Sequence, residues 1–172
     1  VNSVPADVRI ETYVRAKTME AIEATHTKVD AALKAGGDAV GAQTVIATMP
    51  GQLPLACNNR LNELFVANAK IAEPNVAVKD AGHFSASTDM GDVSHLLPVI
   101  HPFIGGVDGF LHTADFHVVD FKHAVLLPAK AFAMMIIDLL ADDAELARQI
   151  KAEHHPLLTK EEYIAKLDKY FQ

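Results

Sequence analysis

Two short stretches near the middle of the chain hold residue types and spacings that could do chemistry. The first reads Ser-Thr-Asp-Met-Gly-Asp-Val-Ser over 87–94, and the second reads His-Thr-Ala-Asp-Phe over 112–116. The hydroxyls and carboxylates of 87–94 have two readings, because such groups cap the first turn of a helix and the same turn suits a substrate carboxylate. Both readings are open from the residues alone.

One of the nine histidines stands out as a candidate for metal or catalytic chemistry. His112 follows a glycine-rich apolar segment at the expected end of a buried strand, where α/β proteins collect ligands. The others have no partner at the i, i+4 spacing of a helical zinc site, and a structural or surface role is expected for them. The sequence contains no phosphate loop and no nucleophile elbow, so nucleophilic catalysis has no support.

Composition narrows the class of protein. The formal net charge of -7 argues against nucleic acid, because phosphate binding needs clustered Lys and Arg. The apolar runs around 124–127 and 134–137 are interrupted by Pro128, Lys130 and Asp138, so no membrane span and no membrane partner are expected. The N-terminus has no signal-peptide pattern and Cys57 is the only cysteine, which favours a cytoplasmic protein without an internal disulfide.

The first fifty residues alternate between strand and helix patterns. Residues 8–15 and 43–49 have strand composition, and between them residues 17–35 carry a helical apolar stripe ended by Gly36-Gly37. A segment boundary is expected near Pro50 to Cys57. The predicted order is strand, helix, strand.

The rest of the chain has mixed patterns. Asn58 is a good N-cap for a helix to residue 73; residues 76–78 and 97–104 suggest a short strand and a buried strand. Residues 121–141 predict a buried helix with Pro128 in its first turn, and 142–154 a more charged helix. Thr159 and Glu162 have the spacing of a capping box for a final helix.

Together these residues resemble peptidase family M-twenty, specifically the C-terminal part of its p-aminobenzoyl-glutamate hydrolase and β-alanyl-dipeptidase type. The resemblance rests on 87–94, on 112–116, on Ala-Lys-Ala-Phe-Ala-Met over 129–134, and on Asn-Ser-Val-Pro-Ala-Asp and Tyr-Val-Arg-Ala over 2–7 and 13–16. The block at 87–94 is the most specific part.

The resemblance implies an α/β fold in two parts. Residues 1–50 would be the second half of a ferredoxin-like lid and dimerisation domain, and residues 51–172 the C-terminal part of a mixed-sheet zinc-hydrolase catalytic domain. His112 matches a metal ligand of the family. Asn2 and Arg15 match positions that contact the substrate's carboxylate, and Ser87 and Thr88 border the substrate site.

The sequence departs from the family in lacking its other metal ligands and its catalytic Glu. The chain is therefore expected to be the C-terminal segment of a metal-dependent amidohydrolase or dipeptidase, inactive alone, that cleaves an amide next to a free carboxylate of a small peptide or acyl-amino acid. Zinc or another divalent metal would serve the complete enzyme without being firmly held by this chain. The expected partners are a missing N-terminal half or complementing chain and a second copy. The alternative is a non-catalytic dimerisation or binding module.

Overall fold

The computed structural model describes residues 3–80, 82 and 86–169. The chain forms two compact units, the first ending at Met49 and the second beginning at Pro50. This division lies beside the predicted domain boundary at residues 50–51. The assignment of the two parts to a lid and a catalytic domain stays a prediction.

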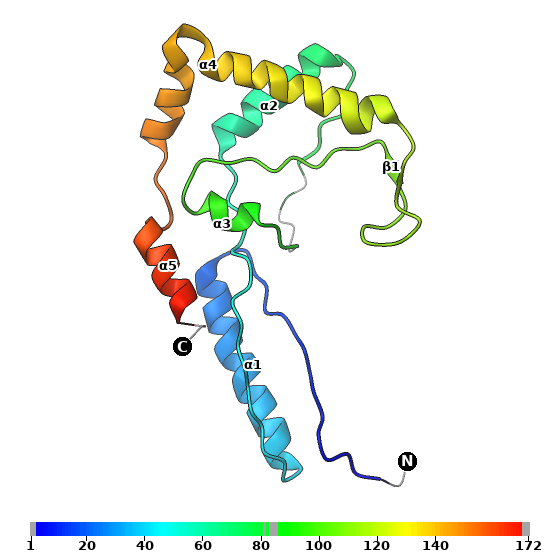
Figure 1. Cartoon of the computed structure of the whole chain (residues 1–172), viewed down its shortest axis with the longest axis vertical. Coiled ribbons are helices and arrows are strands. Elements are labelled where there is room, and N and C mark those ends of the chain that lie inside the picture. Colours follow the sequence, from blue (N-terminus) through cyan, green and yellow to red (C-terminus); the bar gives the residue numbers. More distant parts are fainter. Residues whose placement is uncertain (1–2, 81, 83–85, 170–172) are drawn as a thin grey trace. The chain divides into compact units, whose positions relative to one another are not determined.

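The first unit contains one long helix, α1, which spans Met19–Ala39 (Figure 1). It begins after Thr18, whose Oγ1 accepts a hydrogen bond from Ala21 N at 3.3 Å. The predicted end at Gly36-Gly37 is wrong, because both glycines lie inside the helix and the chain turns at Gly41, with a φ of +71°. An interior glycine costs a helix only about 1 kcal/mol relative to alanine, so a pair of them does not force an end.

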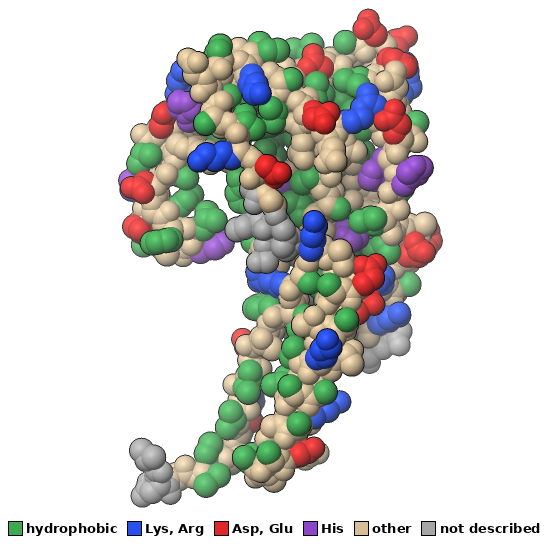
Figure 2. Space-filling model, turned by 180° about the vertical axis from the view of Figure 1, so that it is seen from behind, with side chains coloured by type: hydrophobic (Ala, Val, Ile, Leu, Met, Phe, Trp, Pro, Cys, Tyr) green, Lys and Arg blue, Asp and Glu red, His purple; other side chains and the backbone are tan. Residues whose placement is uncertain are grey.

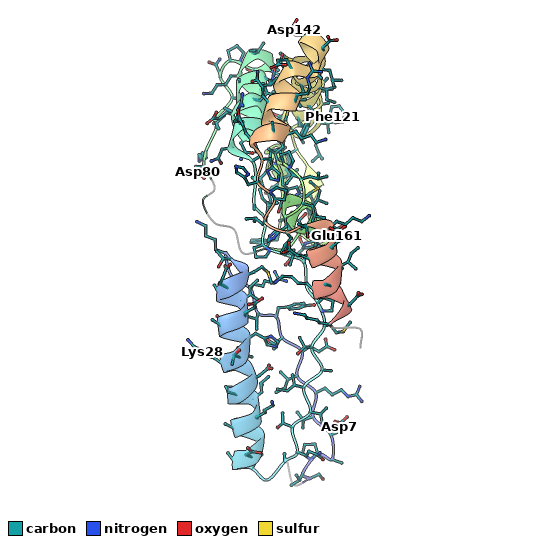
Figure 3. The ribbon with its side chains drawn as sticks, turned by 90° about the vertical axis from the view of Figure 1, so that its left-hand side faces the viewer. Asp7, Lys28, Asp80, Phe121, Asp142 and Glu161 are labelled. Atoms are coloured by element: carbon teal, nitrogen blue, oxygen red, sulfur yellow. The ribbon has the colours of Figure 1, made fainter. Side chains whose placement is uncertain are left out.

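The predicted strands at 8–15 and 43–49 are extended chain without strand pairing. Figure 3 shows the extended chain on one side of α1, while Lys28 projects from the other side. None of the described residues of this unit is buried, and Val45 is 82% exposed. Because a strand exists only with a hydrogen-bonded neighbour, composition alone could not produce one here.

The core of the second unit lies between helices α2, Asn59–Ala72, and α4, Leu127–Glu153. As predicted, Asn58 caps α2, its Oδ1 accepting from Leu61 N at 3.0 Å. The core residues are apolar and come from both helices: Leu61, Phe65, Ala69, Ala131, Met135 and Ile150. At the edge of this core the amide of Asn68, 2% exposed, donates to Asp138 Oδ2 at 2.7 Å, which satisfies a buried polar group.

Helix α4 begins and breaks near the predicted positions. Pro128 lies in its first turn as expected, although a π-helical segment, η1 at Lys122–Leu126, precedes that turn. The backbone leaves helical geometry from Ala141 to Ala144, and Asp142 marks this break in Figure 3. The predicted division into an apolar helix and a more charged one is therefore confirmed.

The predicted burial of 121–141 is wrong for most of its apolar side chains. Leu127, Ala131 and Met135 are buried, but Ile136 is 54% exposed and Leu140 is 63% exposed. By length and composition alone, the helical stretch Lys122–Glu153 could cross a membrane. Burial requires a surface on each side of the helix, and α2 covers one side.

The remaining elements are short. Helix α3 spans Met90–Ser94, strands β1 at Val107–Asp108 and β2 at His117–Val118 form an antiparallel pair, and helix α5 spans Lys160–Asp168. The predicted capping box of α5 is confirmed, with Glu162 N donating to Thr159 Oγ1 at 3.1 Å and Thr159 N to Glu162 Oε2 at 2.7 Å. Residues 76–78 and 97–104 carry no strand.

The sheet of the described residues is this one pair of two-residue strands. It neither confirms nor contradicts the expected α/β arrangement of a ferredoxin-like lid half and a mixed-sheet hydrolase part, which stays a prediction.

Candidate functional site

His112 lies in the loop that joins β1 to β2, not at the end of a buried strand. The pairing of Val107 with Val118 sets the register of the hairpin, and residues 109–116 connect its strands. His112 is exposed and has a φ of +67°, in the left-handed region that few residues other than glycine adopt. The hairpin therefore presents the imidazole to solvent from an unusual backbone conformation.

The loop around His112 is held by its own hydrogen bonds. Thr113 Oγ1 donates to Phe110 O at 2.6 Å and also to Asp115 Oδ1, and His117 Nδ1 donates to Asp115 O at 2.6 Å. Gly109, with a φ of +86°, lets the loop close, because a Cβ there would lie 2.5 Å from Asp115 O. These bonds shape the loop without involving the His112 imidazole.

The metal chemistry expected at His112 needs further ligands. Among the described residues, no group of three or more His, Cys, Asp or Glu side chains is placed to hold a metal ion. The residues present thus fit one ligand position and do not make a closed site. The role of His112 as a metal ligand stays a prediction.

The motif at 87–94 holds two parts of the second unit together. Ser94, 1% exposed, accepts from Ala56 N at 3.0 Å and donates to Gly91 O at 2.6 Å. The buried His95 donates from Nε2 to Pro54 O at 2.9 Å, and Asn58 N donates to Val99 O at 2.8 Å. We call this contact, residues 53–58 held against 91–99, the clamp. Sequence reasoning missed it; a glycine inside a helical pattern, which often marks close packing, was the available signal.

Gly91 is required by the clamp because of its size. A Cβ at this position would lie 2.0 Å from Leu53 O, far inside van der Waals contact. The opposing atom belongs to the backbone, so it cannot turn aside as a flexible side chain would. The most specific stretch of the sequence therefore has a packing role that is independent of any ligand.

Ser87 and Thr88, the predicted substrate-binding pair, precede α3. Ser87 is exposed, and Thr88 Oγ1 accepts from Met90 N at 3.4 Å, a contact that fits the capping interpretation. Asp89 accepts from Gln52 Nε2 and makes no cap hydrogen bond to α3. Among the residues that the structure describes, the Ser87 hydroxyl has no hydrogen-bond partner, whereas the Thr88 hydroxyl already has a backbone donor.

The second carboxylate of the motif, Asp92, contacts helix α5. Burial raises the pKa of the Tyr163 hydroxyl, and the charge of Asp92 and its hydrogen bond with this hydroxyl raise it further. Asp92 of α3 therefore interacts with a side chain of α5. Like Gly91 and Ser94, it has a structural partner inside the unit.

The two remaining predicted residues belong to the first unit. Arg15 is exposed, and its guanidinium carbon lies 5.0 Å from the centre of the Tyr13 ring, a cation–π contact. Asn2 lies outside the described residues. Neither prediction of carboxylate binding is tested by these positions.

A charged cluster that sequence reasoning missed joins the end of α2 to the start of η1. Lys122 pairs with Glu73, and His123 Nδ1 lies 2.5 Å from Asp120 Oδ2. The hydrogen bond and charge of Lys122 hold the pKa of Glu73 below its ordinary value, and the side chain of His123 does the same for Asp120. Asp120 also accepts from His123 N at 3.1 Å, so it caps the helix. This i, i+3 pair at a helix start was the available sequence signal.

Replacing Glu73 with Gln should make the stability of the protein less dependent on pH under acidic conditions. A carboxylate with a lowered folded-state pKa stabilises the fold above its ordinary value of 4.5, and this stabilisation is lost as the pH falls through the folded pKa. The wild-type melting temperature should therefore fall more steeply than that of Glu73→Gln below pH 4.5, as followed by circular dichroism. Glu161→Gln, at an exposed position of α5, serves as control. Parallel profiles for wild type and Glu73→Gln would contradict the pairing.

A shallow pocket of about 370 Å³ opens between the start of α2 and the end of α4. Cys57, Arg60 and His154 are among its lining residues, and Arg60 Nη1 pairs with Glu153 Oε2 at 2.6 Å. Within the described part of the chain, the buried Nε2 of His154 has no hydrogen-bond partner. This pocket contains none of the predicted site residues.

Among the described residues, no hydrogen bond or ion pair joins the Ser87–Thr88 segment to His112, although both lie in the second unit. No protein-family model matches the chain, and searches of curated proteins and of solved structures find no match to it.

Proposed function

We propose that this chain contributes one side of the active site of a metal-dependent amidohydrolase or dipeptidase that cleaves an amide next to a free carboxylate. The observation that carries the proposal is the presentation of His112, the residue that resembles a family ligand. Its imidazole is exposed on a hairpin loop whose own hydrogen bonds leave that imidazole uncommitted. The second unit also contains the exposed Ser87.

The roles in this proposal follow from the chemistry of the side chains. His112 would hold a zinc or similar divalent ion through one neutral nitrogen, and the bound ion would supply Lewis acidity and a water of lowered pKa. The Ser87 hydroxyl can donate to a substrate carboxylate, and Arg15 can pair with one. The general base and the other ligands would come from polypeptide outside residues 1–172.

A non-catalytic binding or dimerisation module is the second candidate. The large apolar surface left exposed on α4 supports it, since contiguous apolar patches mark interaction sites. The same exposed apolar surface is expected of a chain that lacks part of its enzyme, so this surface does not distinguish the two candidates. A measurement of hydrolytic activity does.

The test compares the 172-residue chain with the product of the longer reading frame that includes the sequence upstream of Val1. Both are assayed with zinc on p-aminobenzoyl-glutamate and β-alanyl dipeptides. We expect no turnover by the chain alone, and turnover by the longer product that a chelator removes. Hydrolysis by the isolated chain would overturn the claim that this chain needs other polypeptide for activity. A start codon beside Val1, together with no hydrolysis in either assay, would favour the non-catalytic module.

A further inference from the structure

Helix α4 breaks at residues that would ordinarily continue a helix. Ala141 is extended, with a ψ of 158°, and the next three residues, Asp142, Asp143 and Ala144, have φ values of +49°, +58° and +59°. These three lie in the left-handed region, where the Cβ of an L-residue comes too close to the following carbonyl oxygen. Residues 141–144 include no glycine or proline, and alanine is the best helix former. Local preference therefore favours an unbroken helix.

The apolar pattern of α4 continues through the break. The residues of α4 that belong to the core or pack against it are Ala131, Met135, Leu139, Leu146 and Ile150. Their spacings of four, four, seven and four are helical spacings. At about 100° per residue, a straight helix would hold all five within roughly 100° of its circumference. The sequence thus specifies one continuous apolar stripe along α4.

Helix α2 is too short to cover this stripe on a straight α4. The 14 residues of α2 reach about 21 Å at 1.5 Å each, whereas the 27 residues of α4 would reach about 40 Å in a straight helix. The break turns the second part of α4 back, so that Ala131 and Ile150 are both buried in the core that α2 shares (Figure 1). The three left-handed residues are the steric cost of packing both parts of α4 on one α2.

The chain after the break is held by contacts that do not involve the break itself. We call residues 145–169 the C-terminal arm. Within it, Glu153 Oε2 pairs with Arg60 Nη1 of α2 at 2.6 Å, and Leu158 N donates to His95 O at 3.0 Å. The acceptors and donors that receive the arm lie on α2 and directly after α3, so a second copy of the chain presents the same set.

The break is accessible to solvent. Ala141, Asp142 and Asp143 are exposed, and Figure 2 shows acidic side chains gathered at the end of the unit where α4 breaks. The hinge can therefore change conformation without unpacking a core around it. A short hinge under strain favours domain swapping, the exchange of an identical element between two copies.

We propose that this chain forms a domain-swapped dimer, in which α4 straightens and the C-terminal arm of each copy packs against α2 and His95 of the other. The burial of Ile150 and the contacts of the arm with Arg60 and His95 are kept, while residues 142–144 return to right-handed helix. The apolar stripe of α4, too long for one α2, is then covered by two. This dimer does not depend on the proposed hydrolase activity and uses no contact of the first unit.

The oligomeric state of the 172-residue chain tests the hinge. We expect a dimer in sedimentation equilibrium, formed most readily by refolding from urea at high protein concentration. Ala144→Gly should raise its dissociation constant about 100-fold, because glycine tolerates the left-handed conformation and weakens a continuous helix in both copies. Ala152→Gly is the matched control, since Ala152 is exposed and helical whether α4 is bent or straight. It should dimerise like wild type.

Crosslinking tests whether the arm is exchanged. Cys57 is the only cysteine of the chain, and it lines the same pocket as Leu157 of the arm. In Leu157→Cys, a short thiol-reactive crosslinker should join the two chains of the purified dimer, whereas in the monomer it should link positions of one chain. Leu157→Cys combined with Cys57→Ser should give no covalent dimer on a denaturing gel. His155→Cys repeats the test from a second position, and circular dichroism confirms that each variant is folded.

Three results would overturn the swapped dimer. The first is a wild-type chain that stays monomeric at every concentration, including after refolding. The second is a dimer in which the crosslinks all lie within one chain, which would assign the dimer to another surface. The third is a dimer that Ala144→Gly and Ala152→Gly affect alike, because the left-handed residues would then have no part in it.

Discussion

Replacing His112 with alanine is expected to lower kcat for amide hydrolysis by the proposed complete hydrolase about 1,000-fold or more. A metal ion stabilises the transition state by several kcal/mol, and each 1.4 kcal/mol corresponds to about a tenfold change in rate. Loss of one ligand would both weaken metal binding and misplace the ion. The measurements are kcat at saturating zinc and the bound metal per chain by elemental analysis.

The matched control is His155→Ala, the same substitution at an exposed histidine to which the proposal gives no role. It should keep both activity and metal content. His112→Gln adds a further comparison, because glutamine keeps a polar side chain in the loop but is a poor zinc ligand. Full activity and full metal content in His112→Ala would remove this residue from the site.

Replacing Gly91 with alanine should destabilise the second unit by about 3 kcal/mol, at the upper end of the usual range for overpacking. The added methyl group would lie 2.0 Å from Leu53 O, so the backbone of the clamp must move apart. Alanine is the better helix former by about 1 kcal/mol, which offsets only part of this strain. Urea unfolding followed by circular dichroism measures the change.

Gly105→Ala is the control for Gly91→Ala. A Cβ at Gly105 has no atom within 4 Å, and its φ is not positive, so a near-neutral effect is expected. If Gly91→Ala were as stable as Gly105→Ala, the clamp would not depend on the close approach of Gly91 to the backbone of Leu53. The structural roles left to the motif would then be the hydrogen bonds of Ser94 and Thr88 and the interaction of Asp92 with Tyr163.

Local chemistry in the sequence was enough to place several helix ends. Asn58 caps α2, and Thr159 and Glu162 form the capping box of α5, because these interactions involve residues only three positions apart. Gly36-Gly37 misled for the same local reason, since a glycine pair permits a helix end without requiring one. Pro128 was placed in the first turn of its helix from the proline's missing N–H.

Features that depend on distant parts of the chain could not be predicted from local patterns. Residues 97–104 have strand composition, but a strand also needs a neighbouring strand, which no local signal supplies. The apolar residues around Ile136 predict burial in a complete core, whereas α2 covers one side of this helix in the described residues.

The candidate site was only partly accessible to sequence reasoning for a similar reason. The loop position of His112 follows from its glycine-rich approach, but its hairpin and left-handed backbone depend on the pairing of Val107 with Val118. Ser94 and Asp92 looked like members of a polar capping cluster. Their partners, Ala56 and Tyr163, lie far away in sequence, and only the fold brings them together.

The clamp also affects how this protein exchanges its amide hydrogens. Ala56 N and Asn58 N precede α2 in irregular chain, where exchange is ordinarily fast. Each donates to an acceptor across the clamp, Ser94 Oγ or Val99 O. These two amides are therefore protected for as long as residues 91–99 stay folded, and their exchange rates report opening of the motif from a position outside it.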